Sequence, residues 1–218
     1  MALASWYRED PLPELPRLDG LQIGVARDSG ELARLAGLPV EAVETRWEGG
    51  HTAYVARLFG RPVAYGWVAG LSARIGELDL AFRLAPDERY LWDFETVRHC
   101  RGRGIYPRLL QAIIEAEVDA KKFWIIHAPE NLPSGVGIER AGFTVTAELS
   151  LRANGEPGLV PLGPVDRVLD AADLLGVPLV RSGVSPCWSC GRRSHACGCG
   201  PDAEDEAGCA CWLLPAAV

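Results

Sequence analysis

The sequence lacks three features that would each indicate a particular class of protein. No apolar run approaches the ~20 residues that a helix needs to cross a bilayer, so we expect no membrane partner. The first ten residues carry charges where a signal peptide has an apolar core, and we expect a cytoplasmic protein. Positive charge is not in excess either, since 29 Asp and Glu outnumber 22 Lys and Arg. Nucleic acid is therefore excluded as a main partner, because binding its phosphates needs surplus Lys and Arg.

The chain is long enough for one domain with an appendage. It has 218 residues, of which 48% are hydrophobic, and this composition supports a full core. Residues 1–20 are polar and rich in proline, and we expect them to lie as an extended arm over the surface, anchored by Trp6 and Tyr7 or loosely held. Residues 21–163 form the main domain. Residues 164–218 add one helix and a segment rich in cysteine.

The chain is organised around residues 90–110. The aromatic and β-branched run Tyr90–Val97 predicts a strand, and a basic loop with two glycines follows at Arg101–Gly104. A helix is predicted to begin at Pro107, because proline is preorganised for a first helical position. The apolar residues of this helix recur at helical spacing on one face: Leu109, Leu110, Ile113, Ile114 and Val118.

A strand, a glycine loop and a helix together can hold a phosphate group. Glycines let the backbone approach closely, and the first amides of a helix have no partner within it. The positive end of the helix dipole lies behind those amides, and Arg101 and Arg103 add charged donors. The alternative is a plain turn before a helix.

The remaining pattern predicts a mixed order of strands and helices. Expected strands lie at 21–26, 52–58, 63–68, 75–84, 123–128, 143–151 and 159–162. Expected helices lie at 31–36, 40–47, 133–141 and 164–175.

Two blocks of this sequence resemble the GNAT superfamily of N-acetyltransferases. Arg101-Gly102-Arg103-Gly104-Ile105 is similar to the superfamily's acetyl-coenzyme A loop, although Tyr106 stands where Gly or Ala is usual. Residues 123–143 are similar to its next strand, its Asn-x-x-Ser/Ala step and its closing Gly-Phe. The resemblance covers about residues 20–150. It implies an α/β (α+β) fold, with a mixed, mostly antiparallel central sheet flanked by helices and a splayed pair of central strands.

The resemblance also implies acetyl-coenzyme A as cosubstrate. Its pyrophosphate would lie on the loop amides and its thioester between the splayed strands. Its pantetheine arm would lie against the side chain of Asn131. The positions that match the motif for cofactor binding are Thr96, Val97, Arg101, Gly102, Arg103, Gly104, Ile105, Tyr106, Asn131 and Ser134. The alternative for Asn131 is a turn or capping role.

Two carboxylates on the central strand are the candidates for removing a proton from an amine. Asp93 and Glu95 are two residues apart, so their side chains share one face of a strand. Carboxylates in an apolar strand need a partner or a water-lined cleft, because burying them unpaired is costly. Either one acts as base, or it is paired with an arginine such as Arg98 or Arg103. Tyr90 and His127 are further candidates.

The usual proton donor of the family is missing. Many members carry a tyrosine seven residues after the asparagine, and this chain has Ile138 there. Either Tyr106 or another tyrosine replaces it, or the thiolate leaves unaided, or the chain binds the coenzyme and catalyses poorly.

The C-terminal segment holds six of the seven cysteines in close pairs. In a cytosolic chain such pairs indicate metal ligands rather than disulfides, with zinc first. A zinc ion would take Cys187, Cys190, Cys197 and Cys199, with His195 nearby. The alternative is a tail with free thiols.

We therefore predict an N-acetyltransferase that transfers the acetyl group of acetyl-coenzyme A to a primary amine. The acceptor is a small molecule or a protein amine, and the resemblance allows a homodimer. The alternative is a non-catalytic protein on the same scaffold that binds acyl-coenzyme A or metal.

Overall fold

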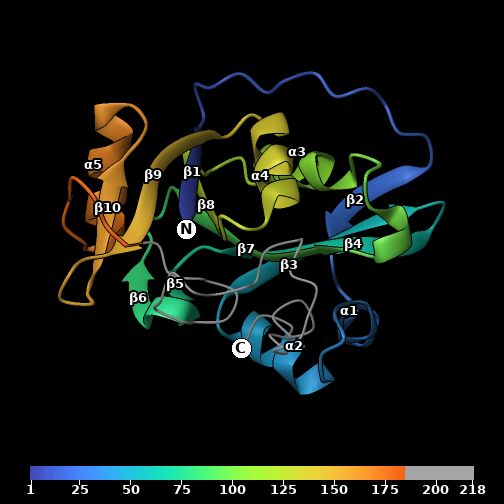
Figure 1. The fold of residues 1–218 in the computed structure, drawn as a ribbon. Coiled ribbons are helices and arrows are strands. Elements are labelled where there is room, and N and C mark those ends of the chain that lie inside the picture. Colours follow the sequence, from blue (N-terminus) through green and yellow to red (C-terminus); the bar gives the residue numbers. More distant parts are fainter. Residues whose placement is uncertain (185–218) are drawn as a thin grey trace, which may run out of the picture.

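The computed structural model describes residues 1–184, which form an eight-stranded sheet with helices on both faces (Figure 1). The sheet is mixed and mostly antiparallel, so the predicted fold class is confirmed. The strands are β1 Ala2–Tyr7, β2 Leu21–Val25, β3 His51–Leu58, β4 Arg61–Ala69, β7 Glu88–Thr96, β8 Lys122–His127, β9 Thr144–Leu151 and β10 Pro157–Pro161, with the hairpin β5 Ser72–Ile75 and β6 Leu80–Arg83 apart. The helices are α1 Ser29–Ala36, α2 Val40–Glu48, α3 Ile105–Ala116, α4 Leu132–Arg140 and α5 Val165–Leu175.

The strand order β10-β9-β1-β8-β7-β4-β3-β2 places β7 and β8 at the centre as a parallel pair. Their pairing covers only Glu88–Leu91 of β7 and Lys122–Ile125 of β8. Beyond these residues β7 continues beside β4, and β8 continues beside β1. The two central strands therefore splay apart at their carboxyl ends, as the sequence predicted.

Residues 2–7 depart from the predicted surface arm. They form β1, which lies between β8 and β9 and pairs antiparallel with both. The strand is buried on both faces, with Trp6 packed toward α3 and Tyr7 toward α5. A strand that is buried on both faces does not alternate between polar and apolar residues. The short apolar run of residues 2–7 therefore did not indicate a strand of the sheet. Residues 11–20 do run without helix or strand along the surface.

Three hydrophobic clusters hold the layers together. The first lies between the sheet and α3, where Leu109, Leu110, Ile113 and Ile114 are fully buried. The second packs α5 and the β5–β6 hairpin against the opposite face, at the β9–β10 end of the sheet. The third lies under α1 and α2 on that same face, around Trp67. Each helix thus covers one part of one face, and β7 has helices on both sides.

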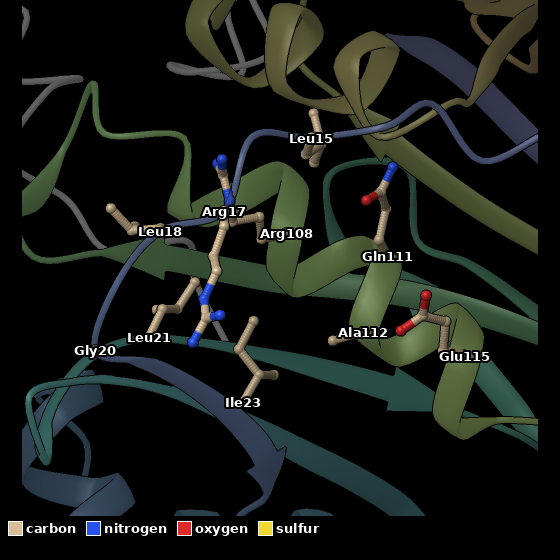
Figure 2. Close-up of a pocket in the computed structure, with 10 residues that line it drawn as sticks. All are labelled: Leu15, Arg17, Leu18, Gly20, Leu21, Ile23, Arg108, Gln111, Ala112 and Glu115. Atoms are coloured by element: carbon tan, nitrogen blue, oxygen red, sulfur yellow. The ribbon is translucent and has the colours of Figure 1, made fainter.

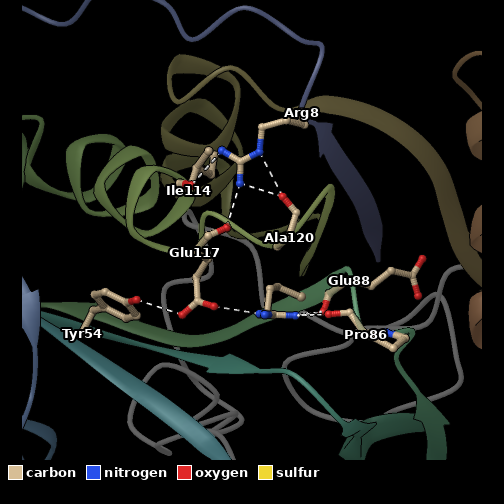
Figure 3. A network of polar contacts seen from close by, with 8 residues as sticks. Arg8, Tyr54, Pro86, Glu88, Ile114, Glu117 and Ala120 are labelled. Atoms are coloured by element: carbon tan, nitrogen blue, oxygen red, sulfur yellow. Dashed lines mark hydrogen bonds and ion pairs between the residues drawn. The ribbon is translucent and has the colours of Figure 1, made fainter.

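The carboxyl end of α3 is fixed by a polar network (Figure 3). Arg8 donates four hydrogen bonds to the carbonyl oxygens of Ile114, Glu117 and Ala120, at 2.7–3.1 Å. The Ile114 carbonyl is one of the last in α3 and has no partner within the helix, and those of Glu117 and Ala120 come directly after it. The Glu117 carboxylate in turn accepts from Tyr54 at 2.9 Å and from Arg89 at 2.8 Å. The network ties β1, β3 and β7 to the end of α3 that lies away from the basic loop.

The predicted strand at 75–84 is two strands instead. A turn of 3₁₀ helix at Gly76–Leu78 separates β5 from β6, and Asp79 adopts a left-handed conformation with φ 52°. Asp tolerates this conformation better than most residues, so the chain reverses here. The hairpin packs on α5 through Phe82, which contacts Tyr90 edge-on at 5.2 Å.

Candidate active site

The basic loop and the start of α3 lie beside the gap between β7 and β8. The helix begins at Ile105, two residues before the predicted start, so Pro107 occupies its third position. The missing N–H of a proline costs little there, since the first turn has no internal acceptors. Gly102 and Gly104 adopt left-handed conformations with φ 75° and 69°. The predicted apolar residue Val118 lies past the helix and is exposed.

Five consecutive backbone amides, from Gly102 to Tyr106, donate to no acceptor among residues 1–184. The preceding amides are used, since Cys100 donates to Val97 and Arg101 to Arg98. The helix dipole adds positive potential behind the free amides. This arrangement can hold an anion such as a diphosphate.

The backbone N–H groups at the end of β7 point alternately toward β4 and toward the gap. Val97 donates to the carbonyl oxygen of Val63 at 2.9 Å, so its amide is occupied. Donors alternate in direction along an antiparallel strand, and the amide of Thr96 therefore faces away from β4. No described strand pairs with β7 on that side beyond Leu91. Of these two predicted cofactor residues, Thr96 is placed to donate to a ligand in the gap.

The arginines of the loop differ in what they contact. Arg101 folds back, donating to the carbonyl oxygen of Thr96 at 2.9 Å and to Glu95 at 3.4 Å. Arg103 is exposed and has no ion pair among the described residues. Arg108 donates to the carbonyl oxygens of Gly104 and Pro16, which ties residues 11–20 to the loop. Arg103 is thus the loop arginine free to reach a phosphate.

Tyr106 reaches from α3 across to α4. Its ring packs on Phe94 at 5.5 Å and against Gly137, where a Cβ would overlap it. Its hydroxyl lies 3.4 Å from the hydroxyl of Ser134. Burial raises the pKa of Tyr106 above its ordinary value, so the phenol stays protonated at neutral pH. Ser134 lies four residues, about one helical turn, before the buried Ile138, where the family's tyrosine is missing.

The start of α4 forms the other side of the gap. Asn131 caps this helix, and its side-chain oxygen accepts from the amide of Ser134 at 3.2 Å. The capping role, which was the alternative for Asn131, is therefore present. Its side-chain NH₂ has no recorded acceptor in the described residues. His127 ends β8, and its Nδ1 contacts the carbonyl oxygen of Ala128 at 2.9 Å.

A β-bulge in β7 decides where the two carboxylates point. The register with β4 shifts between Tyr65 and Trp67, and Asp93 has φ 50°. A Cβ at Gly66, opposite the bulge, would overlap the ring of Phe94. Phe94 consequently turns toward α3, and Asp93 turns toward α2. There the Asp93 carboxylate accepts from Arg46 at 2.5 Å and from the Tyr65 hydroxyl at 3.4 Å.

Glu95 shares this face with Asp93, as the sequence predicted. Its cross-strand partner is Tyr65, which packs toward α1 and α2. Its side chain is 50% exposed and lies 3.4 Å from Arg101. The alternative prediction of pairing with Arg98 or Arg103 named the wrong arginines, because the partners are Arg46 for Asp93 and Arg101 for Glu95.

Sequence reasoning missed the side chains that surround Asp93. Arg46 lies over the rings of Trp67 and Trp92, and Trp92 Nε1 donates to His51 Nδ1 at 3.2 Å. Burial, and then the Arg46 guanidinium, hold the pKa of His51 below its usual value. These residues come from α2, β3, β4 and β7, and only the aromatic character of Trp67 and Trp92 gave a signal.

Tyr90 is not part of the site. It is buried with α5 and the β5–β6 hairpin, where burial raises its pKa above the ordinary value. The side chains of Asp93 and Glu95 lie further along β7 toward the gap.

The proposed metal ligands Cys187, Cys190, Cys197 and Cys199 lie outside the described residues. Within residues 1–184 no group of three or more His, Cys, Asp or Glu is placed to hold a metal ion. Cys100 is a buried free thiol. No helix of residues 1–184 is long and apolar enough to cross a membrane.

A separate groove of about 410 Å³ lies on the far side of α3 (Figure 2). It runs between residues 15–20, the outer face of α3 and the edge strand β2. It is lined by Leu15, Arg17, Leu18, Gly20, Leu21, Ile23, Arg108, Gln111, Ala112 and Glu115. None of the predicted site residues lines it.

Several solved structures resemble part of this chain. A GCN5-related N-acetyltransferase from Kribbella flavida is 17% identical, with a TM-score of 0.43, over 66% of this chain and 53% of that one. A putative GNAT-family acetyltransferase from Novosphingobium aromaticivorans is 19% identical, with a TM-score of 0.46, over 66% and 59%. The putative acetyltransferase yncA from Salmonella typhimurium, solved with acetyl-CoA, is 14% identical, with a TM-score of 0.47, over 62% and 85%.

The match therefore spans little more than half the length of the first two proteins. No protein-family model and no curated protein matches the sequence. The first of these proteins is described as GCN5-related and the second as a member of the GNAT family. The chemistry of this chain depends on its own residues.

Proposed function

We propose that this protein is an N-acetyltransferase that moves the acetyl group of acetyl-coenzyme A to a primary amine. The observation that carries the proposal is the row of free amides from Gly102 to Tyr106 beside the gap between β7 and β8. These amides and Arg103 would bind the diphosphate. The acyl-pantetheine arm would then lie in the gap, with the amide of Thr96 directed at the thioester oxygen.

Glu95 is the residue to which we assign the proton of the amine. Both Asp93 oxygens already accept hydrogen bonds, and its partner Arg46 has a side chain only 13% exposed. Glu95 is half exposed, and its contact with Arg101 is long. The amine nitrogen, once deprotonated by Glu95, attacks the thioester carbon, and the carbon–sulfur bond breaks.

Tyr106 would donate a hydrogen bond to the departing thiolate. Burial raises the pKa of Tyr106, so the phenol keeps its proton at neutral pH and would stabilise the negative charge that forms on the sulfur. Ser134, 3.4 Å from the phenol oxygen, would orient the hydroxyl. The thiolate would take its proton from water as the products dissociate.

The test measures coenzyme A release from acetyl-coenzyme A with a panel of small monoamines. Glu95→Gln should lower kcat/KM by about 10²-fold or more, because a positioned base contributes about 10²–10⁴. Glu115→Gln, on the exposed side of α3, is the matched control and should behave as wild type. Acetyl-coenzyme A binding should be unchanged in both variants.

Two results would contradict the proposal. Wild-type turnover that Glu95→Gln leaves intact would remove the assigned base. Tight binding of acetyl-coenzyme A, seen by native mass spectrometry, without turnover of any amine would favour the non-catalytic alternative.

A further inference from the structure

Arg46 is enclosed by aromatic rings on the α2 side of β7. Its guanidinium carbon lies 4.6 Å from the ring centroid of Trp92 and 5.0 Å from that of Trp67. Its Nη1 donates to the Asp93 carboxylate at 2.5 Å, and its side chain is 13% exposed. Two indole faces and a carboxylate are a typical binding site for an organic cation. In this protein the cation is one of its own side chains.

The bulge in β7 is what supplies the carboxylate to this site. With φ 50°, Asp93 turns its side chain to the same face as Trp92, the residue before it. The Tyr65 hydroxyl donates to the second Asp93 oxygen at 3.4 Å. The site is therefore complete on its own: an aromatic floor, a carboxylate and a hydroxyl surround one guanidinium.

Among residues 1–184, the charges that face this site balance. His51 accepts a hydrogen bond from Trp92 at Nδ1 and is held neutral at pH 7 by burial and by Arg46. Two carboxylates are matched by two guanidinium groups, one pair at 2.5 Å and one at 3.4 Å. The titratable and charged groups that face the site from α2, β3, β4, β7 and the basic loop are Arg46, His51, Tyr65, Asp93, Glu95 and Arg101.

An acceptor with several ammonium groups would need a carboxylate for each. The more exposed Glu95 can receive one ammonium group, the one that becomes acetylated. A second ammonium group a few ångströms away would need the Asp93 carboxylate, but the Arg46 guanidinium already occupies it. The two positive groups would repel each other.

We propose that Arg46 is a specificity-determining residue: an internal cation that occupies a cation-binding site beside Glu95 and so restricts the acceptor to amines with a single positive charge. Diamines, polyamines and other polycationic amines are refused at this position. The proposal rests on acetyl transfer at Glu95, but the occupied cation site can be tested without any transfer.

The experiment removes the internal cation and offers others. Arg46→Ala opens the space over the two indoles, and Arg46→Met fills it with a neutral chain of similar length. Binding of ethylguanidinium and of putrescine to each full-length protein is measured by titration calorimetry at low salt. Arg57→Ala is the matched control, because Arg57 pairs with Glu31 at a distance from the two indoles.

Arg46→Ala should bind ethylguanidinium at least about tenfold more tightly than wild type, since cation–π and charged hydrogen bonds both become available. Arg46→Met should gain affinity for putrescine, because the Asp93 carboxylate is freed. Wild type and Arg57→Ala should bind neither probe measurably. If Arg46→Ala does not fold, folding restored by ethylguanidinium but not by sodium chloride supports the same conclusion.

The proposal fails if neither variant binds the probes better than wild type, or if wild type binds putrescine as tightly as Arg46→Met. Turnover separates this failure from that of the proposed function. Arg46→Met should acetylate putrescine with a kcat/KM at least about tenfold above wild type, for the same electrostatic reason. If all the proteins leave every amine unacetylated while the variants still bind the probes, acetyl transfer is wrong and the cation site stands.

Discussion

Four residues form a continuous stack through the site, from β4 to α4. Gly66 makes room for the ring of Phe94, Phe94 packs on Tyr106, and Gly137 makes room for Tyr106. Any side chain at either glycine would overlap a ring. Aromatic rings packed in this way have little freedom to turn, so the stack fixes the Tyr106 hydroxyl next to Ser134.

Replacing Tyr106 with Phe removes the hydroxyl and keeps the stack. We expect kcat to fall about 10²-fold or more, because removing one donor that stabilises developing charge costs about 10²–10³-fold. KM for the amine and the melting temperature should change little. The measurement is steady-state kinetics at pH 7, together with thermal unfolding.

Tyr54→Phe is the matched control, since that hydroxyl donates to Glu117 at the opposite end of α3. This variant should lose stability and keep its kcat. Equal kcat values for Tyr106→Phe and wild type would mean that the thiolate leaves without a hydrogen bond from Tyr106.

Only part of this residue-scale picture was available from the sequence. The loop glycines, Asn131, Ser134 and the pair of carboxylates could be found because each belongs to a local pattern. The partner of Asp93 could not, since Arg46 is 47 residues away and the bulge that turns Asp93 has no clear sequence signal. The stack on Gly66 and Gly137 likewise depends on contacts between strands and helices.

At the scale of elements, local signals placed most helices and strands to within a few residues. The exceptions have physical reasons. Pro107 predicted a helix start two residues late, because a proline fits anywhere in a first turn. The sequence predicts one strand across the β5–β6 turn, because the left-handed residue of this turn is Asp79 rather than a glycine. The sequence predicts helix α5, but it does not predict which residues hold α5 against the rest of the domain.

Two carboxylates attach α5 to the start of the chain. Arg167 of α5 donates to Asp10 at 2.5 and 2.8 Å, and Asp170 accepts from Lys122 at 2.5 Å and from Tyr7 at 2.7 Å. Burial raises the pKa of each carboxyl, but the hydrogen bonds outweigh it, and both pKa values lie below the ordinary value. The folded state therefore favours the ionised carboxylates.

Acid should consequently weaken the attachment of α5. A carboxyl with a depressed pKa in the folded state contributes stability that is present above its ordinary pKa of about 4 and is lost as pH falls through the depressed value. We expect Asp10→Asn to lower the free energy of unfolding by about 1–2 kcal/mol at pH 7 and by much less near pH 3. Urea unfolding at the two pH values measures both.

Asp173→Asn is the control, because this exposed carboxylate of α5 has no recorded partner within residues 1–184. Its unfolding free energy should follow that of wild type at both pH values. An Asp10→Asn protein with the same pH dependence as wild type would show that the ion pair with Arg167 does not hold the helix.

For the whole molecule, the sequence predicted the class of fold and the splayed strands but not the strand order. The family resemblance began at about residue 20, so nothing in it concerned residues 2–7. Those residues fill the position between β8 and β9, far along the chain from both partners. The sheet is therefore continuous only when β1 pairs with β8 and β9, more than 100 residues further along the chain. Pairing between such distant segments cannot be predicted from local periodicity.

This closure predicts that the protein depends on β1 more than on the residues that follow it. Ser5 pairs with Trp124 of β8 and Thr144 of β9, and its hydroxyl is 2.7 Å from that of Thr146. Ser5→Pro should cost about 3 kcal/mol or more, because proline is not accommodated in a central strand. Urea unfolding followed by circular dichroism measures the loss.

Glu14→Pro, a matched change at an exposed position in residues 11–20, should stay within about 0.5 kcal/mol of wild type. If both variants unfold at the same urea concentration, β1 is dispensable, and the sheet is held together by β7, β8 and the helices alone.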